Sequence, residues 1–241
     1  MKYCFFALLL MLAPLAPAQS RSDAYQGGLV TPPLPKPRFV LTDTSGAPFD
    51  FWTRTSGSVT LLFFGYTSCP DQCPMHMSNI GVALKKLPAI ADQVKLVFVT
   101  TDPTRDTPVR LRKWLYNFDR HFVGLTGIEA ALVAVQKAAG VPAAYKTESG
   151  NGNYSVAHAN FVVAYTKDNL AHVIYPGGVS KDDWIHDLPA PIGKGDLVAP
   201  ITRFLKSQVS DPMGRSSHLY WVPRANRMPP SHSSTASAHP R

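Results

Sequence analysis

Two uninterrupted apolar runs constrain the fold of this chain more than any other feature of its sequence. The runs are SVTLLFFG at 58–65 and QVKLVFVTT at 93–101, and each has the length and composition of a strand buried on both faces. Between them, apolar side chains recur at helical spacing from about Cys73 to Leu87. A buried strand, a helix and a second buried strand in this order predict an α/β fold.

The rest of the central region continues this alternation. Before the first run, residues 38–51 predict a hairpin with Ser45 and Gly46 at its turn. The second run is followed by a helix that Asp106 is expected to cap and that ends at about Phe118. A strand at 122–125 and a helix at 127–140 come next. The pattern then predicts strands at 160–166 and 170–176, joined by Lys167-Asp168-Asn169, and a last helix at 195–206. This order predicts a thioredoxin-like fold, in which helices flank a mixed central sheet and an N-terminal hairpin precedes it.

The two ends of the chain differ from this central region. Residues 1–18 combine a lysine, an apolar stretch and a small-x-small site, which is the pattern of a cleaved export signal. The apolar stretch is shorter than a spanning helix needs, although an uncleaved inner-membrane anchor is the alternative. Residues 19–37 predict a linker, and residues 207–241 predict a disordered tail. We therefore expect an exported, periplasmic protein whose folded domain covers residues 38–206.

Charge and composition restrict the class of partner. The chain has 241 residues, a hydrophobic share of 45% and a net charge of +8, values that fit a globular domain with short extensions. The positive charges are scattered, and no basic run is interleaved with aromatic residues, so we expect no nucleic-acid partner. The positive charge does allow an acidic partner or a membrane surface nearby.

The cysteines point to the chemistry. Cys4 lies in the predicted signal, which leaves only Cys69 and Cys73 in the mature chain. They follow a buried strand and open a helix, where α/β sheets place reactive groups and where the helix N-terminus favours a thiolate. Their spacing suits a disulfide and also suits two sulfurs that share a soft metal. The spacing alone leaves both chemistries open.

A metal held by two thiolates needs a third ligand, for which histidine is the natural candidate. His158 lies between the Gly- and Asn-rich stretch 148–155 and a predicted buried strand, in a loop that a thioredoxin-like sheet would turn toward the cysteines. His76, on the predicted helix, is expected to face the solvent. Asp102, which follows the second apolar run, could orient the cysteine loop or a partner, or could simply make a turn.

The motifs together resemble one known family. The runs LLFFGYTSCPDQCPMHM, VFVTTDPTRDTP, FVGLTG and VAHANFVVAY are similar to those of the Sco (SenC) family of copper-binding proteins, which are needed to assemble cytochrome c oxidase. The resemblance implies that Cys69, Cys73 and His158 bind one copper ion, as Cu(I) or Cu(II), and soft thiolates suit this metal. The family usually has an acidic residue before this histidine and Ser or Thr after it, whereas Ala157 and Ala159 flank it here. This departure bears on copper affinity.

Two functions from different classes follow. The first is a copper chaperone, without catalytic residues, that delivers copper to the dinuclear copper centre of the oxidase. The second is a thiol-disulfide oxidoreductase in which Cys69 attacks and Cys73 resolves, so that the copper-site cysteines of the oxidase are reduced. The expected partners are the copper-site subunit of cytochrome c oxidase, a copper donor protein and a thioredoxin-like reductant that keeps the thiols open in an oxidising compartment. Only the first function has an evident use for His158.

Overall fold

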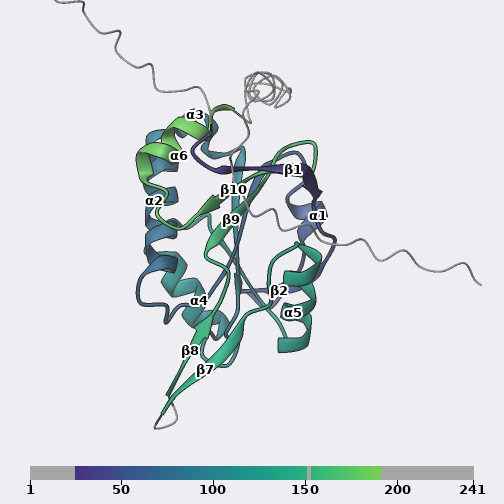
Figure 1. The fold of residues 1–241 in the computed structure, drawn as a ribbon, viewed down its shortest axis with the longest axis vertical. Coiled ribbons are helices and arrows are strands. Elements are labelled where there is room, and N and C mark those ends of the chain that lie inside the picture. Colours follow the sequence, from purple (N-terminus) through teal and green to yellow (C-terminus); the bar gives the residue numbers. More distant parts are fainter. Residues whose placement is uncertain (1–24, 151–152, 191–241) are drawn as a thin grey trace, which may run out of the picture. The chain divides into compact units, whose positions relative to one another are not determined.

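A mixed sheet of eight strands, in the order β1-β10-β9-β4-β5-β6-β2-β3, forms the centre of the molecule, and β7 and β8 pair separately (Figure 1). The computed structural model describes residues 25–150 and 153–190. The strands are β1 (Gly28–Pro35), β2 (Val40–Asp43), β3 (Pro48–Asp50), β4 (Val59–Gly65), β5 (Val94–Thr100), β6 (Val123–Thr126), β7 (Tyr145–Gly150), β8 (Asn153–Ala157), β9 (Phe161–Tyr165) and β10 (Leu170–Pro176). The helices are α1 (Phe51–Arg54), α2 (Gln72–Lys86), α3 (Pro88–Ala91), α4 (Pro108–Leu115), α5 (Glu129–Ala138) and α6 (Lys181–Asp187).

Strand β4 occupies the middle of the sheet, and all of its residues are buried. It pairs in parallel with β5, from Val59 opposite Val94 to Gly65 opposite Thr100, and it pairs antiparallel with β9. A strand with neighbours on both edges and helices over both faces has no contact with water, which explains its uninterrupted apolar sequence. The predicted pair of buried strands and the predicted mixed sheet are confirmed.

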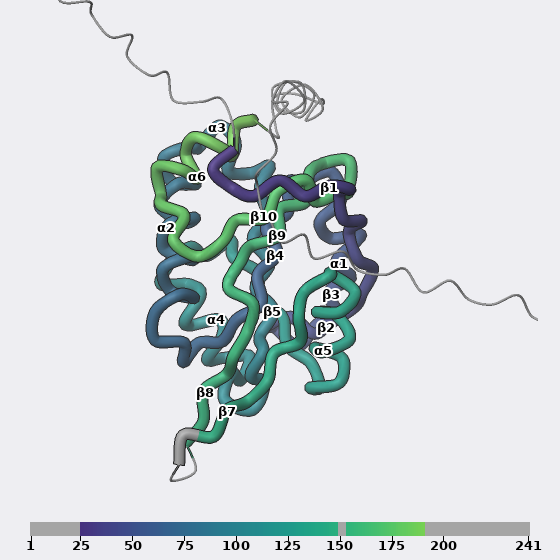
Figure 2. The backbone as a smooth tube through the Cα atoms, viewed as in Figure 1, coloured from purple at the N-terminus to yellow at the C-terminus, as the bar shows by residue number. Residues whose placement is uncertain are grey.

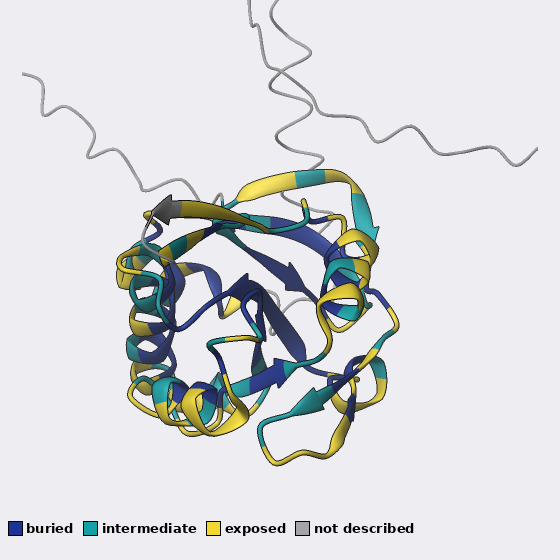
Figure 3. Ribbon diagram, turned by 90° about the horizontal axis from the view of Figure 1, so that it is seen from below, coloured by how far each residue is buried: buried dark blue, intermediate teal, exposed yellow. Residues whose placement is uncertain are grey.

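Helices cover both faces of the sheet because successive side chains of a strand point to opposite sides. Leu61 and Phe63 of β4 pack with α2, α4 and α6 in one core, whereas Leu62 and Phe64 pack with α1 and α5 in the other. The two helical layers stand on either side of the sheet in Figure 1, and Figure 3 shows the buried strands between them. The carboxyl ends of β4 and β5 lie at the same edge of the sheet, since the two strands are parallel.

The predicted turns are present. Gly46 lies in the turn of the N-terminal β2-β3 hairpin with φ +89°, and Gly140 follows α5 with φ +71°. Asn169, in the turn between β9 and β10, has φ 63°. Glycine and asparagine tolerate this left-handed region better than other residues, so each of these turns has a residue that can adopt the backbone angle it requires.

Part of the predicted linker is instead a strand. Residues 28–35, predicted within the linker 19–37, form β1, which pairs antiparallel with β10 at the edge of the sheet. The three prolines of GLVTPPLP conceal it in the sequence, because proline has no N–H to donate to a ladder. An edge strand needs donors on one side only, and therefore tolerates them.

The predicted loop before His158 instead includes two strands. Strands β7 and β8 form a hairpin, in which Tyr145 lies opposite Ala157 and Glu148 opposite Tyr154 (Figure 2). Within β8 only Val156 is buried, so the hairpin lacks the apolar alternation that announces a strand. The hairpin ends at Ala157, immediately before the candidate ligand.

Several predictions concern residues outside the described part of the chain. These are the export signal at 1–18, the first residues of the predicted linker, the helix at 195–206 and the tail at 207–241. In the ranges that are described, no helix has both the length and the apolar character to cross a bilayer.

Candidate metal centre

The loop after β4 and the first turn of α2 present the two cysteines at the sheet edge. After β4 the chain turns, with the Cys69 N–H donating to the Tyr66 carbonyl over 3.2 Å, and α2 begins at Gln72. Cys69 is partly exposed, whereas Cys73, in the first turn of α2, is fully buried. No disulfide joins them in this structure. The two segments therefore offer one accessible sulfur and one sheltered sulfur.

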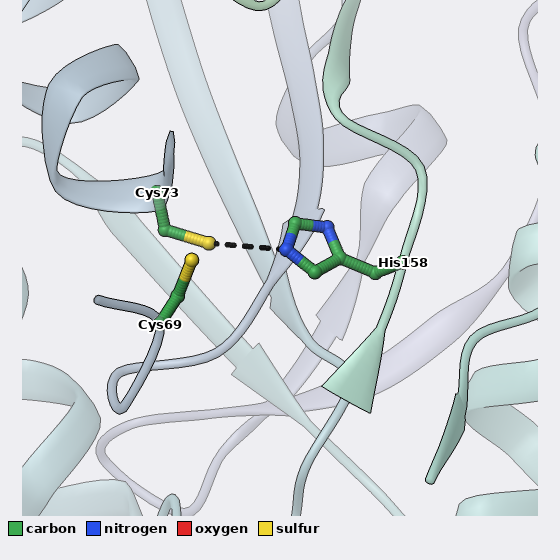
Figure 4. A group of neighbouring side chains, drawn as sticks. All are labelled: Cys69, Cys73 and His158. Carbon is green, nitrogen blue, oxygen red and sulfur yellow. Dashed lines mark hydrogen bonds between the residues drawn. The ribbon is translucent and has the colours of Figure 1, made fainter. Parts of the chain in front are cut away.

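His158 reaches the cysteines from the opposite side, on the segment between β8 and β9. Its Nε2 lies 3.5 Å from the Cys73 Sγ, and the two sulfurs and a ring nitrogen all lie within 4.8 Å of one another (Figure 4). A single metal bonded to sulfur at about 2.3 Å and to nitrogen at about 2.0 Å spans comparable separations between its ligands. Residues that are 85 positions apart thus form one three-ligand cluster.

Aromatic rings and a carbonyl fix the orientation of the imidazole. The His158 ring stands edge-on to Phe63 and Tyr66, with centroids 5.9 and 5.6 Å away. Its Nδ1 lies 3.0 Å from the Ala159 carbonyl oxygen, which makes Nδ1–H the donor and leaves the Nε2 lone pair toward the sulfurs. A backbone carbonyl thus orients the ligand, even though the flanking side chains are only methyl groups.

The two thiols differ in acidity. The hydrogen bond from the Cys73 thiol lowers the pKa of Cys69 well below its ordinary value, against the effect of partial burial, and hydrogen bonds from the backbone N–H groups of Cys73 and Asp71 add to the lowering. Burial raises the pKa of Cys73, and the neighbouring Cys69 raises it further. The first negative charge of the pair therefore resides on Cys69, the sulfur that a partner or a metal meets first.

A buried carboxylate ties the cysteine loop to β5. Asp106 accepts hydrogen bonds from the Thr67 N–H at 2.9 Å, the Thr67 hydroxyl at 2.5 Å and the Thr100 hydroxyl at 2.7 Å. The prediction that Asp106 caps the next helix is wrong, because Thr107 is the cap and accepts from the Arg110 N–H. Asp106 lies in the segment between β5 and α4, and its carboxylate accepts from backbone and hydroxyl donors that would otherwise lack an acceptor.

Asp102 anchors the hairpin that precedes His158. It accepts from the Tyr154 hydroxyl at 2.9 Å and forms an ion pair with Arg105. Arg105 in turn donates to the Tyr154 carbonyl at 3.0 Å, and its guanidinium lies 3.9 Å from the centre of the Tyr154 ring. Of the roles left open for Asp102, the structure supports an orienting one, directed at the histidine segment rather than at the cysteine loop itself.

His76 is placed differently from the prediction. It was expected to face the solvent, but it is only 1% exposed, and its Nε2 lies 3.1 Å from the Asn160 Oδ1. Its ring lies 5.0 Å from that of Phe63, and burial lowers its pKa, so the ring is neutral at physiological pH. The spacing of three residues from Cys73 places both on one helix face and could have indicated the burial. Asn160 has no comparable sequence signal.

The other histidines of the described residues lie apart from the cysteine pair. His121 contacts Asp119, His172 contacts Asp168, and His186 contacts Asp187. The remaining histidines, His218, His232 and His239, belong to the part of the chain that is not described. Among the described residues, the group that could hold a metal consists of Cys69, Cys73 and His158.

Comparison with known proteins gives relatives of similar sequence. A protein of Stutzerimonas stutzeri named "Putative copper-binding protein" is 40% identical over 124 residues, which are 51% of this chain and 60% of that protein. An SCO2-like protein of Rickettsia conorii is 34% identical over 124 residues, again 51% of this chain and 60% of the relative. This chain thus matches about 60% of the length of these relatives.

Solved structures share the fold, and a family model matches most of the described chain. The ScoI protein of Bradyrhizobium japonicum with copper bound superposes with a TM-score of 0.59 at 30% identity, covering 65% of this chain and 98% of that one. Apo Sco1 of Thermus thermophilus gives a TM-score of 0.63 at 29% identity, covering 71% and 99%. The fold is therefore thioredoxin-like, as predicted. The SCO1/SenC model matches residues 31–192, and this chain belongs to the SCO1/SenC family.

Proposed function

We propose that this protein binds one copper ion through Cys69, Cys73 and His158 and delivers it to the dinuclear copper centre of cytochrome c oxidase. The observation that carries the proposal is the convergence of two sulfurs and an imidazole nitrogen within 4.8 Å. Family membership supports it, as does the similarity to a ScoI structure that contains copper.

The ligand set favours copper over zinc. Cu(I) prefers soft sulfur ligands, and two thiolates with one imidazole also suit Cu(II). Zinc usually takes four ligands, and in the described residues no fourth His, Cys, Asp or Glu joins the cluster. Cys69 is partly exposed, so a bound ion stays open to a receiving protein on one side, as transfer requires.

The proposal extends to the place of action and the partners. Residues 1–18 direct the chain out of the cytoplasm to the periplasm, where the oxidase's copper-site subunit receives the metal. A separate donor protein supplies the copper. A thioredoxin-like reductant keeps Cys69 and Cys73 as thiols, since an oxidising compartment would otherwise join them.

Copper titration of the reduced protein tests the ligand set. Wild-type protein should retain one equivalent, and His158→Ala should lose more than about 100-fold in affinity, beyond the loss that follows removal of an outer partner of a ligand. His121→Ala is the matched control, because its side chain is 95% exposed and its interaction within the described residues is with the Asp119 carboxylate. Equal copper retention by the two variants would contradict the assignment of His158.

The lowered pKa of Cys69 favours a second function, which is thiol-disulfide exchange. In a thiol-disulfide exchange, the Cys69 thiolate bonds to one sulfur of a partner disulfide, and the other partner sulfur leaves as a thiolate that takes the Cys73 proton. Cys73 then attacks Cys69 and releases the second partner sulfur. The partner gains two electrons, and this protein becomes the Cys69–Cys73 disulfide.

Metal-free protein separates the two functions. The reductase function predicts that reduced apo-protein converts an oxidised copper-site domain of the oxidase to its dithiol form, and that His158→Ala retains this activity. The copper-carrier function alone predicts no reduction by apo-protein. Cys69→Ser should abolish reduction and serves as the negative control.

A further inference from the structure

The outer face of α4 and the turn after it carry cations without acidic partners. Arg110, Lys113 and Arg120 are exposed, and Arg112 is partly exposed. None of these four forms an ion pair within the described residues. Asp119, which immediately precedes Arg120 in the sequence, contacts His121 instead. A surface of one sign beside a functional site attracts a partner of the opposite sign.

A hollow between these cations offers apolar contacts as well. It encloses about 450 Å³ and is lined by Val109, Arg112, Lys113, Tyr116, Asn117 and Arg120. Val109 is 75% exposed and Tyr116 is 47% exposed, and the Arg120 guanidinium lies 6.0 Å from the Tyr116 ring. Tyrosine and arginine are among the side chains most enriched in the strong contacts of protein interfaces.

This face is continuous with the candidate metal centre. Arg110 donates from Nε to the Thr67 hydroxyl and from Nη2 to the Ser68 hydroxyl, both at 2.9 Å. Ser68 immediately precedes Cys69 in the chain. A helix of eight residues is about 12 Å long. A protein bound along α4 would therefore extend to the neighbourhood of the Cys69 and Cys73 sulfurs.

We propose that the α4 face, defined by Val109, Arg110, Lys113, Tyr116 and Arg120, docks an acidic protein surface and aligns that partner with the cysteine loop. The inference rests on the proposed function and specifies the charge of the copper-exchanging partner. The remainder of this chain does not supply the acidic surface, because basic residues outnumber acidic ones seven to two in residues 191–241. A second copy is disfavoured by the net charge of +8. An anionic membrane would not need the hollow or the contact with the cysteine loop.

Paired charge reversals test the docking face. Lys113→Glu with Arg120→Glu changes the α4 face and leaves Arg110, which supports the cysteine loop, in place. Lys85→Glu with Lys86→Glu gives the same change in charge at the opposite end of α2, where both lysines are exposed. The probe is the soluble copper-site domain of the oxidase from the same organism, and both its binding to apo-protein and its uptake of copper from loaded protein are measured.

The α4 variant should bind the domain and transfer copper about tenfold more slowly at low salt, with unchanged copper stoichiometry. The difference should shrink near 0.5 M salt, where charges are screened beyond a few ångströms. The α2 variant should behave like wild type. Equal slowing of both variants would mean that only net charge matters, and no slowing would mean that α4 does not dock; either result overturns the inference.

Two further outcomes separate this inference from the proposed function. Wild-type protein that binds the domain through α4 but transfers no copper would contradict copper delivery and support the docking face. Normal transfer by the α4 variant, combined with loss of its binding to phosphatidylglycerol vesicles, would assign the face to a membrane and overturn docking of a protein. Neither binding nor transfer by wild type would contradict both proposals.

Discussion

Gly65 makes room for the buried sulfur of the metal centre. A Cβ atom at this position would lie 2.7 Å from the Cys73 Sγ and 2.7 Å from a ring carbon of Phe63. Neither neighbour can yield easily, since Cys73 and Phe63 are both fully buried. The glycine that ends the apolar run therefore has a specific task, which is to let the first turn of α2 pack against the end of β4.

Tyr154 connects the same centre to the acidic residue after β5. Tyr154→Phe removes the hydroxyl that donates to Asp102 and keeps the ring that stacks on Arg105. Because the hairpin then holds His158 less firmly, we expect copper affinity to fall about 3- to 10-fold, at or below the lower end of what outer partners of metal ligands contribute. The measurement is competitive copper titration, together with NMR signals of the His158 ring, which should broaden.

Tyr145→Phe is the matched control for this change. Tyr145 lies on the other strand of the same hairpin and is 66% exposed. Loss of its hydroxyl should alter neither copper affinity nor the ring signals. If the two variants retained copper equally well, Asp102 would have only a structural role in the hairpin.

At the scale of elements, the loop between β4 and α2 is held by groups that lie outside it. Asp106 accepts three hydrogen bonds from Thr67 and Thr100, and all three residues are buried. Buried donors without an acceptor cost about 1–3 kcal/mol each, so this single carboxylate governs the geometry of the loop that carries Cys69 and precedes Cys73.

Replacement of that carboxylate should therefore destabilise the protein and loosen the site together. Asp106→Ala leaves a buried N–H and two hydroxyls without their acceptor, and we expect the free energy of unfolding to fall by about 3 kcal/mol. Asp106→Asn keeps one acceptor oxygen and should recover a good part of the loss. Denaturant unfolding measures both variants, with copper affinity as the second readout.

An exposed acid provides the comparison for Asp106. Asp182→Ala removes a carboxylate whose contact with Lys181 is at the surface, and such pairs contribute at most about 1 kcal/mol. If Asp106→Ala were no more harmful than this control, the loop would have to be held by other contacts.

The predictability of the elements follows from where their contacts lie. Strands β4 and β5 are surrounded on both faces, so their own sequences carry the apolar pattern. Strand β1 is stabilised by its ladder with β10, and strands β7 and β8 pair with each other. None of these three strands is therefore evident from its local sequence. Tertiary pairing determines these elements.

The candidate site divides in the same way. The cysteine pair is visible because the two residues are only four positions apart, and the family resemblance indicates His158. The contacts of Tyr154 with Asp102 and of His76 with Asn160 join segments 52 and 84 residues apart, and no local pattern reports them. What supports the ligands is therefore less predictable from the sequence than the ligands themselves.

At the scale of the whole molecule, one buried lysine joins segments from across the fold. Lys36 is only 4% exposed, and its Nζ contacts the Thr55 carbonyl at 3.1 Å, the Thr60 hydroxyl at 3.4 Å and the Asn169 side-chain oxygen at 3.5 Å. All three oxygens belong to uncharged groups. Burial, and then the positive charge of Lys95, lower the pKa of Lys36 to about 8.

This lowered pKa predicts how global stability depends on pH. An unfolded lysine has a pKa of about 10.4, so between pH 8 and 10 the unfolded chain binds more protons than the folded one, and stability contributed through Lys36 rises with pH. Relative to Lys36→Met, the wild-type free energy of unfolding should rise by about 1–2 kcal/mol from pH 7.5 to 10, since residual solvent contact screens part of the effect. Denaturant unfolding at several pH values measures this difference, in which the titration of cysteines and tyrosines common to both proteins cancels. Lys137 is exposed, so the difference in unfolding free energy between wild type and Lys137→Met should not change with pH. If the difference for Lys36→Met were also constant, or fell with pH, the Lys36 amine would be solvated as freely in the folded protein as in the unfolded chain.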